Sequence, residues 1–300
     1  MDQKGLGVVN GIRVGTASVN WGFDPFYDWV STPSFGRMLD EMAECGYYGT
    51  EISYNFPDDP EILRSELARR NLAPAATFHA IDVRDAVNHE DAIASSMRVA
   101  DRLQAIGSDV LILSDKPSAA RIAVAGRARK DHALDERSWK AMCTGLQRVA
   151  QRLRARGMRA VFHPHVGTYV ETRDEIDRLC AGTEPGLLGL CPDTGHLAYA
   201  GTSPEALFSD YADRIEYVHL KDVDERKLAR VRAEGINFVD AVRMGMFVEL
   251  GTGMVSIPNI VGALNASNYS GWIIVEQDAP ADPHGSAARN RRYLLENFGL

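Results

Sequence analysis

The chain has 300 residues, of which 45% are hydrophobic and 25% are charged, and its formal net charge is −8. This is the composition of an ordinary globular protein. The acidic balance argues against nucleic-acid binding, and hence against a nuclease, because such binding depends on clustered Lys and Arg. No apolar run approaches the roughly 18 residues of a membrane helix, and the start shows no charged-then-apolar leader, so we expect a cytoplasmic protein without membrane contact.

The cysteine pattern and the length fit one intracellular domain. Cys45, Cys143, Cys180 and Cys191 show no C-x-x-C spacing, so we expect them to be reduced and mostly buried. An α/β barrel occupies about 250 residues and tolerates insertions, so a single domain can account for the whole chain.

Eight apolar runs predict strands, at residues 12–17, 48–52, 73–78, 110–113, 160–163, 187–190, 215–220 and 272–276. Helical periodicity between them predicts the connecting helices, and several start signals are explicit. Asp59-Pro60 and Ser203-Pro204 are N-cap residues followed by proline, and residues 172–175 form a capping box. A closing helix is predicted over residues 289–298.

Strands that alternate with helices predict a parallel sheet with right-handed crossovers. No G-x-G-x-x-G follows the first strand, and polar residues end at least four strands. A closed (β/α)₈ TIM barrel, in which all carboxyl ends meet on one face, is therefore favoured over an open doubly wound sheet. We expect a single domain over residues 1–300, with insertions near 115–133 and 224–246.

Two segments stand outside the repeat. Residues 20–33 carry the aromatic residues Trp21, Phe23, Phe26, Tyr27 and Trp29. They form either a hydrophobic plug or one wall of a substrate pocket, with Trp21 as a substrate contact in the second case. Residues 115–133 are irregular, basic and Ala-rich; a segment of this length without periodicity is often functional, and we predict a lid.

Four strand-like runs end in a side chain that can bind a metal ion. These side chains are His163, Asp193, His219 and Glu276. Each has a structural alternative, since a strand histidine is commonly a hydrogen-bonded core residue and Asp193 before a Gly-containing turn is a typical N-cap. A barrel would bring all four together, and imidazole with carboxylate oxygen favours a divalent transition ion. We therefore predict a metal site.

Further polar residues lie beside these four. His165 follows His163 by two residues, so both point to the same side of an extended chain, and His165 either replaces His163 as ligand or faces the substrate. His196 is either a partner of a ligand or a substrate contact. Lys221 and Glu51 bind substrate in one interpretation and form surface ion pairs in the other.

These residues carry a family resemblance. GYYGTE at 46–51, HPHVGT at 163–168, DTGHL at 193–197, VHLKDV at 218–223 and Val275-Glu276 resemble the xylose isomerase-like superfamily of sugar isomerases and epimerases. Within it, the chain is most similar to the inosose dehydratases (2-keto-myo-inositol dehydratases) of inositol catabolism. The resemblance covers nearly the whole chain and implies a metal held by Asp193, His219 and Glu276.

His163 falls on the position that is usually Glu in the epimerases, where two carboxylates move a proton between opposite faces of a carbon. The resemblance therefore implies a lyase that eliminates water from a keto-inositol through a metal-stabilised enolate. Manganese or cobalt is the expected ion, with zinc, iron and magnesium as alternatives. Glu276 or His196 is the expected base, and His165 or Lys221 assists departure of the hydroxyl.

Other functions use the same site. The first alternative is a metal-dependent ketose or inosose isomerase or epimerase, and the second is β-elimination from a 3-keto-glycoside. A different class is a metal-free sugar-binding or regulatory protein, which an intact ligand set disfavours. In each case the partner is a small polyol or keto-sugar, and barrel precedent suggests a homo-oligomer.

Overall fold

The computed structural model describes residues 8–24 and 27–300, so Phe26 lies outside the described residues. The barrel strands are β2 (Ile12–Thr16), β3 (Gly49–Thr50), β4 (Ala73–Pro74), β5 (Thr77–Ile81), β6 (Val110–Asp115), β7 (Arg159–Phe162), β8 (Leu188–Leu190), β9 (Tyr217–Leu220) and β12 (Trp272–Val275). Outside the barrel wall, β1 (Val8–Val9) pairs with β2, and β10 (Asp222–Val223) pairs with β11 (Phe247–Val248), both antiparallel.

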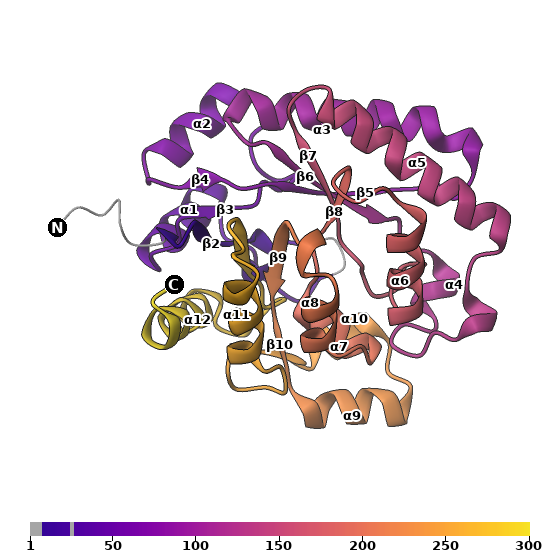
Figure 1. The fold of residues 1–300 in the computed structure, drawn as a ribbon. Helices are drawn as coiled ribbons and strands as arrows, with labels where there is room; N and C mark the ends of the chain where they lie inside the picture. The colour runs from indigo at the N-terminus through magenta and orange to yellow at the C-terminus, as the bar shows by residue number, and fades with distance from the viewer. Residues whose placement is uncertain (1–7, 25–26) are drawn as a thin grey trace.

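The strands close into a ring of parallel neighbours (Figure 1). One run of pairs is β4-β3-β2-β12-β9 and the other is β5-β6-β7-β8. Parallel bridges from Leu190 to Ile215 and from Asp193 to His219 join β8 to the β9 side. On the other side, β4 and β5 are two parts of one chain stretch. The predicted (β/α)₈ TIM barrel is confirmed.

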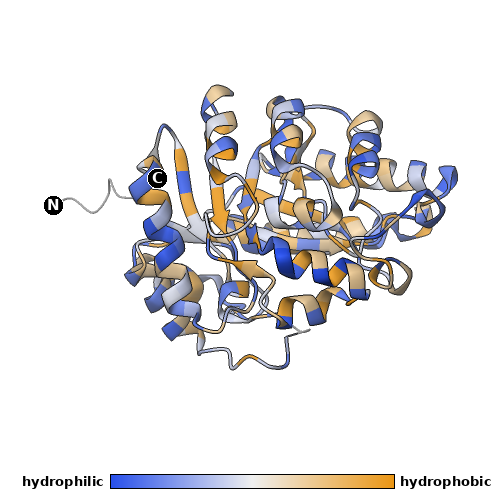
Figure 2. Cartoon of the chain, turned by 90° about the horizontal axis from the view of Figure 1, so that it is seen from below, coloured by the Kyte–Doolittle hydropathy of each residue, from blue (hydrophilic) through white to orange (hydrophobic). Residues whose placement is uncertain are grey.

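Helices surround this ring (Figure 1). They are α1 (Phe35–Glu44), α2 (Pro60–Ala68), α3 (His89–Ile106), α4 (Ala119–Ile122), α5 (Glu136–Arg154), α6 (Arg173–Gly182), α7 (Thr194–Ala200), α8 (Pro204–Asp210), α9 (Glu225–Glu234), α10 (Phe238–Arg243), α11 (Ile257–Ala266) and α12 (Pro283–Phe298). Apolar residues concentrate on the strands and on the inner helix faces (Figure 2). Among the helices of residues 8–24 and 27–300, none has both the length and the apolar character of a membrane span.

Two apolar clusters divide the core. The larger lies between the helices and the strands. The smaller fills the barrel interior and consists of residues in or next to the strands, among them Val161, Cys191, Tyr217 and Ile274. Because side chains alternate along a strand, the residues two positions further on also face inward, at the carboxyl end of the barrel. That end carries the candidate site residues.

Some element boundaries differ from the sequence prediction. The third strand is split at residues 75–76 and continues to Ile81 instead of ending at His79, whose Nε2 lies 3.2 Å from Ser95 Oγ on α3. The closing helix begins at Pro283 rather than at 289, because Asp282 caps it by accepting from the Gly285 amide. Helix α7, directly after Asp193, was not predicted.

The two segments expected as insertions have distinct structures. Residues 224–246 contain the helices α9 and α10, and Figure 1 shows α9 beyond the end of the barrel. Residues 115–133 contain the short helix α4 and a 3-10 turn, η4 (Lys130–His132). The side chain of Arg121 in α4 is fully buried, so the segment is fixed at this residue, whereas most of its other residues are exposed or half-buried.

Candidate active site

The alternation of side chains builds the site. Each of four interior residues is followed two positions later by a candidate ligand, which gives the pairs Val161 and His163, Cys191 and Asp193, Tyr217 and His219, and Ile274 and Glu276. All four candidate ligands are buried. The parallel bridge between Asp193 and His219 sets two of them side by side. The structure therefore brings together the residues at these four strand ends.

Asp193 caps a helix, which is one of the two roles that its sequence context suggested. Its Oδ1 accepts from the backbone amides of Gly195, at 2.7 Å, and His196, at 2.9 Å, and so caps α7. Its Oδ2 makes no hydrogen bond with the described residues. One oxygen thus fixes the carboxylate, while the other points into the site.

His219 lies at the centre of the carboxylates. Its Nε2 donates to Glu51 Oε1 at 2.7 Å, whereas its Nδ1 lies 3.4 Å from Glu276 Oε2 and 3.8 Å from Asp193 Oδ2. Burial by itself would lower the pKa of His219, but Cys191, Glu276 and Glu51 raise it well above its usual value. Glu51, expected as a substrate contact, is therefore in the site as the partner of His219.

Lys221 adds a buried cation. Its Nζ lies 2.7 Å from Asp278 Oδ1, 3.1 Å from Glu276 Oε2 and 3.4 Å from Asp193 Oδ2. Burial opposes the charge, yet Asp193, Asp278 and Glu276 raise the pKa of Lys221 well above its usual value. Burial also raises the pKa of Glu276 to about 7, against the influence of His219 and Lys221. The lysine thus keeps its proton, and its surface ion-pair alternative does not apply.

The donor set fits a divalent ion. His219 Nδ1 and Asp193 Oδ2 are buried and form no hydrogen bond within the described part of the chain. Buried polar atoms of this kind normally have a partner, and these two lie beside a further carboxylate. Close groups of donor atoms occur at Glu51, His219 and Glu276 and at His163, Cys191 and His219. Imidazole and carboxylate oxygen together suit manganese, iron, cobalt or zinc.

Three imidazoles form the other half of the site. The His163 ring centroid lies 4.9 Å from that of His219, and those of His165 and His196 lie 3.9 Å apart. Burial lowers the pKa of all three, so they are neutral near pH 7. His163 is thus the strand-end histidine next to His219, while His165 pairs with His196.

Hydrogen bonds assign the tautomers of this pair. His165 Nδ1 lies 2.7 Å from the Val166 carbonyl oxygen and must donate to it, so Nε2 carries the lone pair. His196 Nδ1 accepts from the Val166 amide at 3.5 Å, so its Nε2 carries the hydrogen. One imidazole can therefore accept a proton at Nε2, and the other can donate one.

Aromatic side chains that the sequence analysis did not single out border the histidines. Phe78 is 40% exposed, and its ring lies edge-on to His163 with centroids 5.7 Å apart. Phe238, from α10, stacks on His196 with centroids 5.6 Å apart. Phe78 lies two residues after the interior residue Ala76, so the same alternation could have identified it. Phe238 lies in an insertion, and its sequence gives no such signal.

The aromatic segment 20–33 reaches the site at a different residue from the one expected. Trp21 is 1% exposed, and its Nε1 donates to Glu41 Oε2 on α1 at 2.6 Å. The structure therefore does not bring Trp21 to the site. Tyr27 instead donates to Asp278 Oδ2 at 2.7 Å, next to Lys221. Asp278 follows Glu276 by two residues and is a further carboxylate that the sequence analysis missed.

These features define a (β/α)₈ barrel with a buried cluster of carboxylates, imidazoles and one lysine at the carboxyl end of its strands. The chain belongs to the xylose isomerase-like TIM barrel family, whose model matches residues 39–297.

Its relatives include proteins named inosose dehydratase, and two of them serve as examples. The one from Lacticaseibacillus casei is 33% identical over 288 residues, covering 94% of this chain and 96% of that one. The one from Geobacillus kaustophilus (strain HTA426) is 35% identical over 291 residues, covering 95% and 94%.

Solved structures share the fold at lower identity. The probable 3-DHS dehydratase AsbF from Bacillus anthracis superimposes with a TM-score of 0.73 at 13% identity, over 95% of this chain and 99% of that one. The IOLI protein, whose structure contains a zinc atom, gives a TM-score of 0.71 at 14% identity, over 94% and 96%.

Proposed function

We propose that this protein is an inosose dehydratase, a hydro-lyase that removes water from 2-keto-myo-inositol. The relatives with this name match this chain along nearly its whole length and nearly the whole of their own. The observation that carries the proposal is the neutral pair His165 and His196 beside His163, at the strand end where an epimerase would place a second carboxylate. This arrangement suits elimination better than proton transfer between opposite faces of a carbon.

A divalent ion fits the proposal, with Asp193, His219, Glu276 and His163 to hold it. When bound, such an ion supplies a Lewis acid that polarises a ketone and stabilises negative charge on its oxygen. Manganese or cobalt is the ion we propose. Glu51, through its bond to His219 Nε2, orients that imidazole so that Nδ1 faces Asp193 and Glu276.

The tautomers suggest the proton transfers. His165 Nε2 has the free lone pair and takes the proton α to the ketone, while His196 Nε2–H donates to the β-hydroxyl, which leaves as water. The C–H electron pair becomes the new carbon–carbon double bond as the C–O bond breaks. This assignment makes His165 the base, whereas the sequence favoured Glu276 or His196 for that role. Lys221 supplies a fixed positive charge beside Glu276.

The walls of the site support a small ring-shaped substrate. The rings of Phe78 and Phe238 lie near the same histidines, from β5 and α10. Aromatic faces of this kind pack on the C–H face of a polyol ring, while the imidazoles and Lys221 can form hydrogen bonds with its oxygen atoms. A small polyol or keto-sugar is therefore the proposed substrate. An inosose epimerase is the second candidate, because it would use the same divalent ion.

The test compares Asp193→Asn with Asp210→Asn, a change at an exposed carboxylate that pairs with Arg173. Asparagine keeps an oxygen to cap α7 but removes the charge. Metal content of protein purified without chelator is measured first, and then the ultraviolet absorbance of an enone product from 2-keto-myo-inositol. We expect only Asp193→Asn to lose metal and product formation. Wild-type protein that binds metal but yields an epimer would favour the second candidate.

A further inference from the structure

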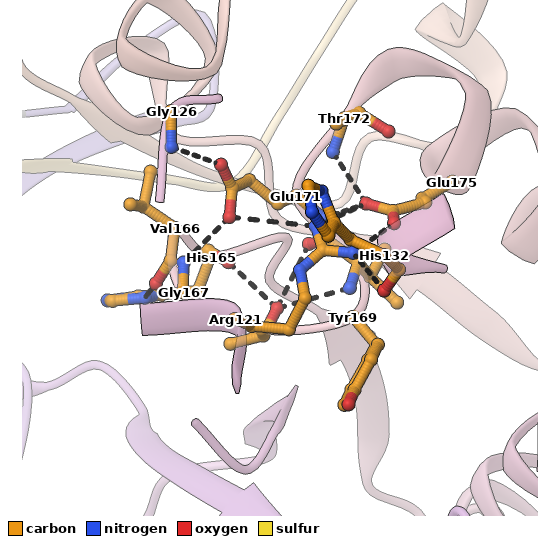
Figure 3. Close-up of polar contacts among 12 residues, drawn as sticks. Arg121, Gly126, His132, His165, Val166, Gly167, Tyr169, Glu171, Thr172 and Glu175 are labelled. Atoms are coloured by element: carbon orange, nitrogen blue, oxygen red, sulfur yellow. Dashed lines mark hydrogen bonds and ion pairs between the residues drawn. The ribbon is translucent and has the colours of Figure 1, made fainter. Parts of the chain in front are cut away.

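Segment 115–133 contains a buried ion cluster that the proposed reaction does not use. Arg121 Nη1 donates to Glu175 Oε1 at 2.5 Å, and its Nη2 donates to Oε2 at 3.0 Å. The same Nη2 lies 3.7 Å from Glu171 Oε2. All three side chains are buried, and Figure 3 shows the arginine directed at both carboxylates. A buried ion pair is weak evidence of a stabilising role.

Glu171 joins two loops through backbone amides. Its Oε1 accepts from Gly126 at 2.6 Å, and its Oε2 accepts from Gly167 at 2.8 Å (Figure 3). Gly126 belongs to segment 115–133, and Gly167 to the loop that follows β7. Both glycines have positive φ angles, 72° and 81°, so the loops adopt backbone conformations that other residues rarely take. The segment and the loop are thus fastened at one carboxylate.

The fastened peptide also contacts His165, one member of the proposed catalytic pair. The Gly167 amide that donates to Glu171 and the Val166 carbonyl that accepts from His165 Nδ1 belong to the same peptide unit. Glu171 and His165 therefore hold this peptide from its two opposite sides. If the peptide turned, the Val166 oxygen would leave His165, and the bond that keeps the hydrogen on Nδ1 would be lost.

We propose that Glu171 is a positioning residue, which fixes the Val166–Gly167 peptide and thereby the tautomer and direction of the His165 imidazole. Arg121 acts through Glu171, because its Nη2 attracts Glu171 Oε2 from the side of α4 at 3.7 Å. The inference rests on the proposed function for the catalytic role of His165. The hydrogen-bond arrangement on which it depends is independent of that function.

The experiment uses Glu171→Gln in the full-length protein with its metal. Glutamine has one acceptor oxygen in place of two, so one of the two amides loses its partner. We expect kcat to fall roughly 10- to 100-fold, as displaced catalytic groups do, with metal content unchanged and KM changed less. Imidazole ¹⁵N chemical shifts should show His165 passing from one Nδ1–H form to a mixture of tautomers. Arg121→Lys should show the same changes to a smaller degree.

The matched control is Glu216→Gln, at a partly buried glutamate that precedes β9 at the opposite end of the barrel. It should leave kcat and the His165 spectrum unchanged. A lower melting temperature of Glu171→Gln with an unchanged His165 tautomer and unchanged kcat would overturn the proposal and leave a structural role only. If Glu171→Gln folds poorly, Arg121→Lys tests the proposal instead, with kcat and the His165 tautomer as the two measurements. A changed tautomer in a protein without dehydratase activity would overturn the proposed function and keep the positioning role.

Discussion

The bond between Glu51 and His219 gives a quantitative prediction for metal binding. The two side chains are 168 positions apart in sequence, are 5% and 2% exposed, and meet at 2.7 Å. Removing such a partner of a metal-binding histidine typically weakens metal affinity 10- to 100-fold. For Glu51→Ala we therefore expect a loss of about 1.4–2.7 kcal/mol in binding free energy. The unpartnered His219 Nε2–H should also destabilise the fold by about 1–3 kcal/mol.

The assay is calorimetric titration of chelator-treated protein with Mn²⁺, together with urea unfolding of the same samples. Glu51→Gln keeps a neutral acceptor for His219 and should lose less affinity than Glu51→Ala. Glu216→Ala, at the opposite end of the barrel, should bind Mn²⁺ as the wild type does. Unchanged affinity in Glu51→Ala would refute the reasoning. A loss as complete as that of Asp193→Asn would instead make Glu51 a direct ligand.

Two further predictions concern the substrate and the pH dependence of stability. Phe78→Ala removes an exposed aromatic wall beside His163. In steady-state kinetics, KM for the inosose should therefore rise about tenfold, with metal content unchanged. An unchanged KM would contradict this role. Burial raises the pKa of Asp115 to about 6, so the folded chain holds this proton more tightly than the unfolded chain. The free energy of unfolding should therefore fall by about 3 kcal/mol as pH rises from about 4 to about 6. Urea unfolding of Asp115→Asn should lack that part of the pH dependence, and equal slopes in both proteins would contradict it.

Local signals in the sequence determined the elements and the ends of the strands. The proline after Asp59 and the capping box at 172–175 were sufficient to start α2 and α6, because a cap is satisfied within four residues. The same kind of signal, Asp282 followed by proline, marks the start of α12, which the prediction of a helix from residue 289 did not use. His163, Asp193, His219 and Glu276 could be chosen because each ends an apolar run, and a barrel brings such ends to one face.

The tertiary structure alone decided which atoms meet. The pairing of Glu51 with His219, and of Tyr27 with Asp278, joins residues more than a hundred positions apart. Trp21 and Tyr27 lie in one aromatic segment, yet one packs on α1 and the other approaches Lys221. No sequence pattern distinguishes them, because contacts across a closed barrel depend on register and on loop paths.

His163 and His165 also show what the sequence determined and what only the tertiary structure decided. The spacing of His163 and His165 placed both on one side of the chain, but it left open which of them lies beside His219. The structure places the His163 ring centroid 4.9 Å from that of His219, because His163 directly follows β7. His165 lies further along the loop, where its Nδ1 bonds to the Val166 carbonyl oxygen. Segment 115–133 had suggested a lid because it lacks periodicity. Arg121 is nevertheless buried within it, because the guanidinium finds its partners Glu171 and Glu175 in a distant part of the chain.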